Sequence, residues 1–305
     1  MMAADSQTPE PRGVLRHAEP MSRHTTWRVG GPARVWYQPA DLEDLAAFLA
    51  GLPDGEEIVW VGLGSNLLVR DGGIPGVVIA PFSGLDRMER LADGRVRAEA
   101  GVSCAKLARF CAREGLAGGE FFAGIPGTVG GALAMNAGAF GGETWERVVA
   151  VETLDRHGRI HERAADEYSI GYRAVQGPVG EWFVAAHLAF PPGDTAAAQA
   201  NVRQLLARRG ETQPTRQPSC GSVFRNPEGD HAARLIEACG LKGYCIGGAC
   251  VSDKHANFII NAGEATAAEI EQLIGRVQQR VAEQFGIELQ TEVRIIGIAA
   301  PEEET

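Results

Sequence analysis

The sequence lacks a basic tract. Its 305 residues include 29 lysines and arginines against 39 aspartates and glutamates, a formal net charge of -10. Proteins that bind the nucleic-acid backbone carry a clustered Lys/Arg footprint. We therefore expect no nucleic-acid partner, whereas a local basic site for a phosphate-bearing small molecule remains allowed.

The sequence also lacks a long apolar run. Glycine or charge interrupts every candidate before the roughly 20 apolar residues that a membrane span needs. Residues 1–13 are polar and have no apolar segment of the signal-peptide kind. We expect no membrane insertion, a cytoplasmic location and a flexible tail over residues 1–21.

Cysteine is scarce and unpaired in the sequence, with six copies and no CxxC motif. Cys239, Cys245 and Cys250, followed by His255, raise the alternative of a metal site, but their spacing fits no common zinc pattern. We expect no metal and no disulfide framework, and we interpret these cysteines as small buried apolar residues.

Glycine is abundant, with 39 copies gathered in two clusters. The first cluster, 62–66, follows the apolar run 58–61, and the second extends from 124 through 131 to 142. Neither matches the Rossmann G-x-G-x-x-G or the phosphate loop of NTPases. Successive backbone amides in such loops still form a nest for phosphate oxygens. Two structural loops are the alternative, and we favour a dinucleotide cofactor.

Short strand-like and helical patterns alternate without a regular βαβ order, which indicates an α+β protein. Asp41 and Ser103 are expected helix caps, and Thr266 with Glu269 forms a capping box before a long helix that ends at Gly286. Residues 287–296 alternate like a strand. Because Pro191 to Asp194 resembles a boundary, we expect a ligand-binding domain over 22–192 and a C-terminal domain over 193–305.

Four other segments carry polar residues that also have ordinary structural interpretations. Ser222 follows Cys220-Gly221 and can project a hydroxyl into a cleft, or simply belong to a turn. Arg173 can brace a carboxylate or lie on the surface. Glu292 alternates with buried positions and can be solvated. Lys254 begins a polar segment that can belong to a binding site or simply be a loop before a strand.

Together these segments resemble the UDP-N-acetylenolpyruvoylglucosamine reductase family of peptidoglycan synthesis. The resemblance runs in order from about Ser22 to Gly297. It rests on GLGSNLLVRDGG (62–73), AGIPGTVGGALAMNAGAFGGE (123–143), IGYR (170–173), PSCGSVFRNP (218–227), KHANFIIN (254–261) and TEVRIIG (291–297).

The resemblance implies an FAD-binding fold of the vanillyl-alcohol oxidase and p-cresol methylhydroxylase type, with two subdomains and a smaller α+β substrate-binding domain. Arg173, Ser222 and Glu292 match the catalytic residues of the family. The expected FAD-binding residues are Gly62, Gly64, Ser65, Asn66, Leu67, Gly124, Ile125, Pro126, Gly127, Thr128, Gly130, Gly131, Asn136, Gly138 and Ala139. The expected substrate-binding residues are Tyr172, Arg225, Asn226 and Lys254.

The implied reaction is NADPH-dependent reduction of UDP-N-acetylglucosamine enolpyruvate to UDP-N-acetylmuramate on noncovalent FAD. Hydride passes from NADPH to FAD and from flavin N5 to substrate C3, and Ser222 protonates C2. Arg173 and a protonated Glu292 stabilise the charge that develops on the substrate carboxylate. Each preorganised donor of this kind contributes about 3 kcal/mol.

Two departures from the family pattern mark this chain. Val175 stands where serine is usual, and the interval between Arg173 and Ser222 is too short for a long substrate-covering insertion, as in the shorter second type of the family. A flavin oxidase on the same fold and a non-catalytic FAD- or nucleotide-binding module remain alternatives. A monomer is the default expectation.

Overall fold

The computed structural model describes residues 10–301, and its first part is a mixed sheet near the N-terminus. The strand order is β1-β2-β5-β3, in which β1 is antiparallel to β2 and the other three run parallel. The strands are β1 (Val14–Pro20), β2 (Pro32–Gln38), β3 (Ile58–Trp60) and β5 (Ile74–Ile79). The predicted tail over 1–21 is therefore wrong for residues 14–20, and residues 1–9 lie outside the described part.

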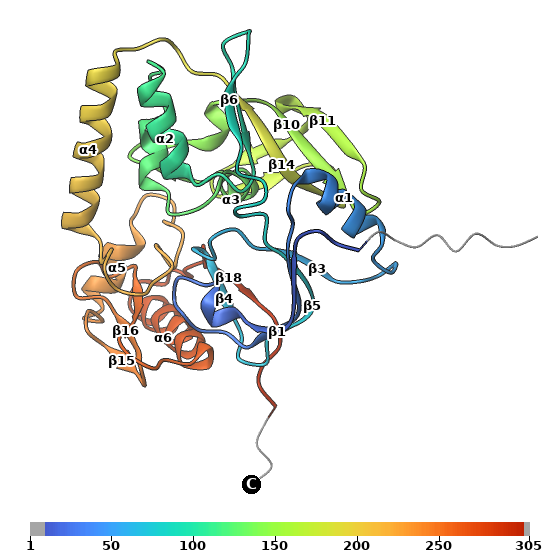
Figure 1. Ribbon diagram of the computed structural model, residues 1–305. Coiled ribbons are helices and arrows are strands. Elements are labelled where there is room, and N and C mark those ends of the chain that lie inside the picture. Colours follow the sequence, from blue (N-terminus) through green and yellow to red (C-terminus); the bar gives the residue numbers. More distant parts are fainter. Residues whose placement is uncertain (1–9, 302–305) are drawn as a thin grey trace, which may run out of the picture.

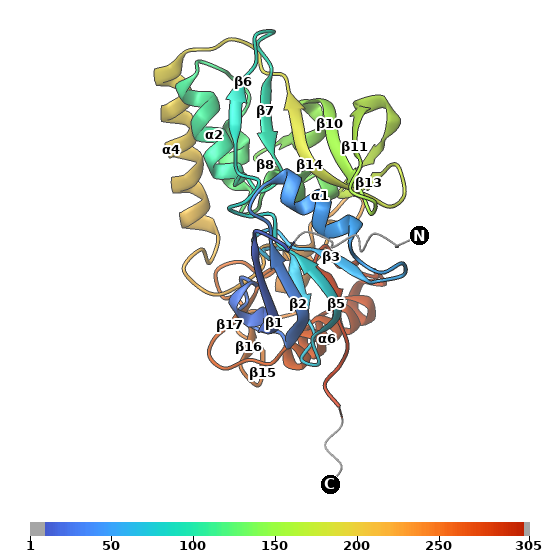
Figure 2. The same cartoon turned by 45° about the vertical axis from the view of Figure 1, so that its right-hand side comes forward.

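A second, antiparallel sheet with the order β11-β10-β14-β7-β6 lies above the first in Figure 2. Helix α1 (Leu42–Ala50) packs between the sheets, since Leu45 and Leu49 share a core with Ile79, Leu154 and Val184. The strands are β6 (Met88–Arg90), β7 (Val96–Glu99), β10 (Val148–Asp155), β11 (Ile160–Ala164) and β14 (Glu181–Leu188).

Two short hairpins and several single-turn helices lie between the longer elements of this part of the chain. The hairpins are β8 (Gly138–Ala139) with β9 (Gly142–Glu143), and β12 (Ser169–Gly171) with β13 (Ala174–Gln176). The short 3-10 helices are η1 (Met21–Arg23), η2 (Glu120–Gly124), η3 (Thr144–Glu146) and η4 (Ala165–Glu167).

The helix caps follow the sequence prediction. The side chain of Asp41 caps α1, and that of Ser103 caps α2 (Cys104–Arg113). Thr266 and Glu269 form the capping box of α6 (Ala267–Phe285), which ends at a left-handed glycine, Gly286. Helix α3 (Val129–Met135) begins in the second glycine cluster, where Thr128 is its N-cap.

Helix α4 (Thr195–Thr212) corrects the expected domain boundary at 192/193. Its buried residues Ala198 and Val202 belong to the same core as Leu107 and Cys111 of α2. Figure 1 shows α4 running alongside α2. Pro191 to Asp194 is therefore a connection within the first packing unit, and the chain reaches the C-terminal unit only after α4.

The C-terminal unit packs its own helices and strands around a second core. Its elements are α5 (Ala232–Ala238), α6, β15 (Cys245–Ile246), β16 (Ala249–Val251) and β17 (Ile259–Asn261). Trp27 and Leu68 from the first part of the chain contribute to this core. Strand β18 (Arg294–Ile296) pairs in parallel with β4 (Leu67–Val69). The predicted strand over 287–296 is thus confirmed only at its end.

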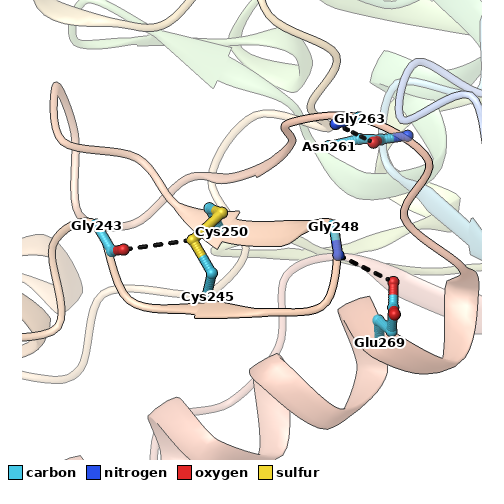
Figure 3. The surroundings of a disulfide bond; sticks show 7 residues. All are labelled: Gly243, Cys245, Gly248, Cys250, Asn261, Gly263 and Glu269. Atoms are coloured by element: carbon cyan, nitrogen blue, oxygen red, sulfur yellow. Dashed lines mark hydrogen bonds between the residues drawn. A yellow bond between two sulfur atoms is a disulfide. The ribbon is translucent and has the colours of Figure 1, made fainter.

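A disulfide joins Cys245 and Cys250, which lie opposite each other on β15 and β16 with a Cα–Cα distance of 4.1 Å (Figure 3). The interpretation of these two cysteines as buried apolar residues is therefore wrong, and Cys239 is half-buried. A spacing of five residues with two glycines between allows a tight hairpin, which the sequence pattern alone did not reveal. In residues 10–301, no group of His, Cys, Asp and Glu side chains is placed to hold a metal ion.

Within the described part of the chain, no helix combines the length and the apolar character needed to span a bilayer.

Candidate active site

A cavity of about 390 Å³ lies where the glycine loops meet the C-terminal unit. The first part of the chain supplies both loops, and the C-terminal unit supplies the segments around Ser222 and Glu292. Predicted site residues that line it are Gly62, Gly64, Ser65, Asn66, Leu67, Gly124, Ile125, Pro126, Gly127, Thr128, Gly131, Gly138, Ala139, Tyr172, Arg173, Ser222, Asn226 and Glu292.

The two glycine loops face each other closely enough to require glycine. A Cβ atom on Gly62 would lie 2.6 Å from Thr128 Oγ1, so a side chain there would push the loops apart. Gly64 has a φ of +61°, a left-handed conformation that disfavours other residues. A Cβ on Gly127 would meet Ser65 Oγ at 3.5 Å and Ile125 Cγ2 at 3.9 Å, both ordinary contact distances, within the cavity. The space beside Gly127 is thus open for a ligand.

The first loop leaves its backbone amides free. Within residues 10–301, the amides of residues 62–66 donate no hydrogen bond to a protein group, and the amides of Gly127 and Thr128 likewise donate none. Clustered free amides at the wall of a cavity bind anions such as phosphate without adding charge. The loops therefore fit the diphosphate of a dinucleotide cofactor.

Arg173 occupies the turn of the β12–β13 hairpin. Gly171 pairs with Ala174, which leaves Tyr172 and Arg173 as a two-residue turn, and Arg173 has a φ of 54°. This left-handed conformation is strained for a residue with a side chain. Arg173 Nε donates to Glu292 Oε1 at 3.1 Å, and 14% of the Arg173 side chain is exposed. The turn thus directs the guanidinium to Glu292.

Glu292 is held by backbone hydrogen bonds on two sides. Its amide donates to Val223 O at 2.8 Å, so its segment lies beside that of Ser222. The side-chain amide of Asn66 donates to Glu292 O at 3.0 Å, and Arg294 N donates to Asn66 O at 3.0 Å. Asn66 therefore ties the glycine loop to the glutamate.

Ser222 is positioned by a buried asparagine. The side chain of Asn257 accepts a hydrogen bond from Phe224 N at 3.0 Å and donates one to Phe224 O at 2.8 Å. Val223 N donates to Asn257 O at 2.9 Å. The Ser222 hydroxyl lines the cavity and makes no hydrogen bond to the described residues. It is free to interact with a ligand.

Burial raises the pKa of Glu292 above its usual value, and the positive charges of Arg173 and Arg225 only partly oppose this effect. Burial removes water that would solvate the carboxylate, which favours the neutral acid. Glu292 Oε1 accepts from Arg173, so Oε2 is the oxygen that can carry a proton. The arrangement places a potential acid beside a permanent cation.

Four predicted binding residues lie elsewhere. Gly130 packs against Ala100 behind the second loop. Asn136 is buried, and its side chain bonds to protein groups. Arg225 borders a neighbouring hollow because it points away from the side of its segment that carries Phe224 and Asn226. Lys254 donates to Gly210 O at 2.5 Å. None of these four residues lines the cavity, and their predicted ligand contacts stay predictions.

The sequence patterns missed four polar residues of the cavity wall, Arg209, Gln213, Asn257 and Arg294. Arg209 lies on α4 and donates to Gln213 Oε1 at 3.1 Å, and burial lowers the pKa of its guanidinium. The basic end of this helix is visible in the sequence. That this basic end points to the cavity depends on the packing of α4 against the first unit. The expected domain boundary at 192 assigned α4 to the other domain and therefore did not predict this packing.

Comparisons with known proteins agree with this division of the chain. A family model described as FAD binding domain matches residues 33–163, which include both glycine loops. A model described as UDP-N-acetylenolpyruvoylglucosamine reductase, C-terminal domain, matches residues 213–296 and begins just after α4.

Relatives match along nearly the whole chain. A UDP-N-acetylenolpyruvoylglucosamine reductase of Alkalilimnicola ehrlichii is 60% identical over 98% of this chain and 99% of its own length. One from Legionella pneumophila is 56% identical over 96% of both chains. The crystal structure of the Thermus caldophilus reductase is 32% identical with a TM-score of 0.80, over 93% of this chain and 98% of that chain.

Proposed function

The chain belongs to the UDP-N-acetylenolpyruvoylglucosamine reductase family, and from this membership we propose that it reduces UDP-N-acetylglucosamine enolpyruvate to UDP-N-acetylmuramate. FAD is the cofactor and NADPH the reductant. The observation that carries the proposal is the 3.1 Å contact of Arg173 with Glu292 in the cavity that Ser222 and both glycine loops line.

The glycine loops would hold the diphosphate of FAD. Their free amides supply neutral donors, which suit an anion inside a protein of net charge -10. Asn66 and Thr128 support the loops from behind through hydrogen bonds to protein groups. When bound, FAD supplies the hydride chemistry between NADPH and the substrate double bond.

Arg173 and Glu292 would stabilise the reacting substrate. Addition of hydride to a double bond conjugated with a carboxylate moves negative charge onto the carboxylate oxygens. The Arg173 guanidinium stays charged and donates from a fixed geometry. A protonated Glu292 Oε2 donates to the same oxygens, and the burial that raises the pKa of Glu292 favours this protonated form.

Ser222 would deliver a proton to substrate C2. Ser222 lines the cavity and its hydroxyl has no partner among the described residues, so no group of residues 10–301 competes for it. A serine hydroxyl is a weak acid and transfers its proton only to a strongly basic carbon. Addition of hydride at C3 would leave negative charge at C2, and that carbon would be basic enough to accept the proton.

The experiment is substrate-dependent consumption of NADPH by the purified yellow protein under anaerobic conditions. Beyond the one equivalent that reduces the flavin, we expect continued NADPH oxidation only when UDP-N-acetylglucosamine enolpyruvate is present, with UDP-N-acetylmuramate as product. A flavin oxidase would instead turn over without this substrate once oxygen is admitted, and a non-catalytic module would not turn over under either condition. Either result refutes the proposal.

We further propose that the active form is a monomer in the cytoplasm. Every residue assigned to the reaction comes from one chain, so a second copy is not needed to complete the site. The cytoplasmic location follows from the reaction, because NADPH and nucleotide sugars are cytoplasmic metabolites. Light scattering of the active preparation tests the first statement.

A further inference from the structure

Arg173 contacts a second carboxylate, that of Glu143 in strand β9. Glu143 Oε1 accepts from Arg173 Nη1 at 3.3 Å, and its other oxygen, Oε2, accepts from Asn136 Nδ2 at 2.8 Å. The same arginine also donates to the carbonyl oxygens of Asn136 and Gly138, at 3.1 and 3.3 Å. Glu143 therefore bridges the arginine and a neighbouring amide.

The amide that anchors Glu143 is itself immobile. Asn136 is 2% exposed and ends helix α3 in a left-handed conformation. Its Oδ1 accepts from Trp145 N at 3.1 Å, and its Nδ2 also donates to Gly171 O at 3.2 Å. Glu143 is thus held by a buried group that connects α3 to the turn carrying Arg173.

We propose that Glu143 is a positioning residue that holds the Arg173 guanidinium in its reactive orientation and shares the charge of the arginine with Glu292. This inference rests on the function proposed above, since it gives Glu143 a role in the same reduction. Glu143 acts through Arg173 and not by contact with the substrate.

Only a carboxylate satisfies both neighbours of Glu143. Arg173 Nη1 and Asn136 Nδ2 are donors, so both oxygens of residue 143 must accept. An amide offers one acceptor and one donor and would place an N–H group against one of them. Asn136 cannot turn its oxygen to receive that donor, because Trp145 N already occupies it.

The charge of Glu143 also affects Glu292. Because Arg173 interacts with two carboxylates, its positive charge stabilises the ionised form of Glu292 less than it would if Glu292 were its only carboxylate partner. Removal of the Glu143 charge leaves Glu292 as the sole carboxylate partner of the arginine. The ionised form of Glu292 then gains stability, and the pKa of Glu292 falls.

The test replaces Glu143 with glutamine and follows the two half-reactions separately. For E143Q we expect reoxidation of the reduced flavin by the enolpyruvyl substrate to slow by about 10- to 100-fold, the range for a misplaced positioning group. Flavin content and flavin reduction by NADPH should be little changed. The alkaline limb of the substrate reaction should move to lower pH, which a merely structural defect would not cause.

The matched control is E146Q. Glu146 lies three residues further along, is exposed and makes no hydrogen bond or ion pair with the described residues. It undergoes the same change of charge, so we expect parental rates and a parental pH profile. A shift of the pH limb in E146Q equal to that in E143Q would overturn the specific role of Glu143.

A double-mutant cycle with Arg173→Lys examines whether Glu143 acts through the arginine. In that background E143Q should add little, because the guanidinium that Glu143 positions is gone. Full additivity of the two effects overturns the inference. So does an E143Q variant that loses FAD or that keeps parental kinetics.

The E143D variant provides a second route if E143Q does not fold. Aspartate retains the charge and both acceptors but is one methylene shorter, so the rate should fall while the pH limb stays in place. A parental rate in E143D refutes the positioning role. If the parent enzyme itself fails to reoxidise with the substrate, the proposed function fails and not this inference alone.

Discussion

The two sides of the cavity rely on different parts of the chain. On the glycine-loop side, residues 62–66 and Gly127 line the cavity, and their backbone amides donate to no described protein group. On the opposite side, Arg173, Ser222 and Glu292 line the cavity. In the function proposed above, the first side would bind the cofactor through shape and neutral dipoles, and the second would act through charge and proton transfer.

This difference predicts opposite sensitivities. Added bulk should disable the glycine side, where a Cβ already meets the facing loop or the ligand space. Loss of a single functional group should disable the other side and leave the cofactor in place. Variants that separate cofactor binding from the reaction therefore test the division directly.

The largest effect is expected from Gly127→Leu. The new side chain would extend into the space that the cofactor is proposed to fill, because the Cβ position makes only ordinary contacts, with Ser65 Oγ and Ile125 Cγ2. We expect colourless protein without reductase activity, as judged by the visible flavin spectrum.

The control for this change is Gly275→Leu on the exposed surface of α6, where a Cβ would meet nothing within 4 Å. That variant should remain yellow and active. Full flavin occupancy in Gly127→Leu would remove the second loop from the cofactor site.

Next in size is Ser222→Ala. Loss of the proton donor should slow flavin reoxidation by the substrate by about 10²- to 10⁴-fold, the usual contribution of a general acid. Flavin reduction by NADPH should be little affected, and stopped-flow measurement of each half-reaction shows this.

Ser219→Ala is the matched control, because Ser219 lies in the same segment but not on the cavity wall. Equal damage to both half-reactions in Ser222→Ala would contradict the assignment of Ser222 as the proton donor.

Glu292→Gln should have a smaller effect, about 10- to 100-fold on the substrate half-reaction, since the amide still donates a hydrogen bond in place of the acid. The parental rate should fall as pH rises through the raised pKa of Glu292, because the protonated form is the donor. Glutamine does not titrate, so the alkaline limb should disappear.

Rate–pH profiles of the parent, Glu292→Gln and the exposed control Glu288→Gln measure this prediction. A limb that persists in Glu292→Gln belongs to another group and would remove Glu292 from the acid role. Release of FAD in Glu292→Gln would assign it to the binding side of the cavity instead.

The smallest effect on activity is expected from Cys245→Ser, because the disulfide hairpin does not border the cavity. Loss of a cross-link over so short a loop should lower the free energy of unfolding by about 2 kcal/mol. Thermal unfolding should therefore occur at a lower temperature while the rates stay parental.

Cys239→Ser is the comparison variant for stability, since Cys239 is a free thiol. If a reducing agent leaves the unfolding temperature of the parent unchanged, the disulfide does not stabilise the protein in solution.

The glycine loops could be predicted from the sequence because the constraints that select their residues act between neighbours in the chain. Left-handed turns and close approaches select glycine, so the clusters around Gly64 and Gly127 indicated a ligand loop without any structure. Capped helices such as α6 were predicted for the same reason, since the cap and the helix are neighbours in sequence.

The opposite side of the cavity, formed by Arg173, Ser222 and Glu292, depends on contacts between segments that are distant in the sequence. Arg173 and Glu292 are 119 residues apart, and only the resemblance to a family joined them before the structure did. The motifs alone could not show that Arg225 and Lys254 lie off this cavity wall, because a motif does not state which way each side chain points. Helix α4 was misassigned because proline and glycine mark a turn but not the core that follows it.

The most direct test of the account is an anaerobic cycle on the purified protein, followed through the flavin absorbance in the parent and in Ser222→Ala. We predict that NADPH bleaches both proteins and that UDP-N-acetylglucosamine enolpyruvate rapidly restores the colour of the parent alone. Equal recovery in both proteins, or no recovery in the parent, would contradict it.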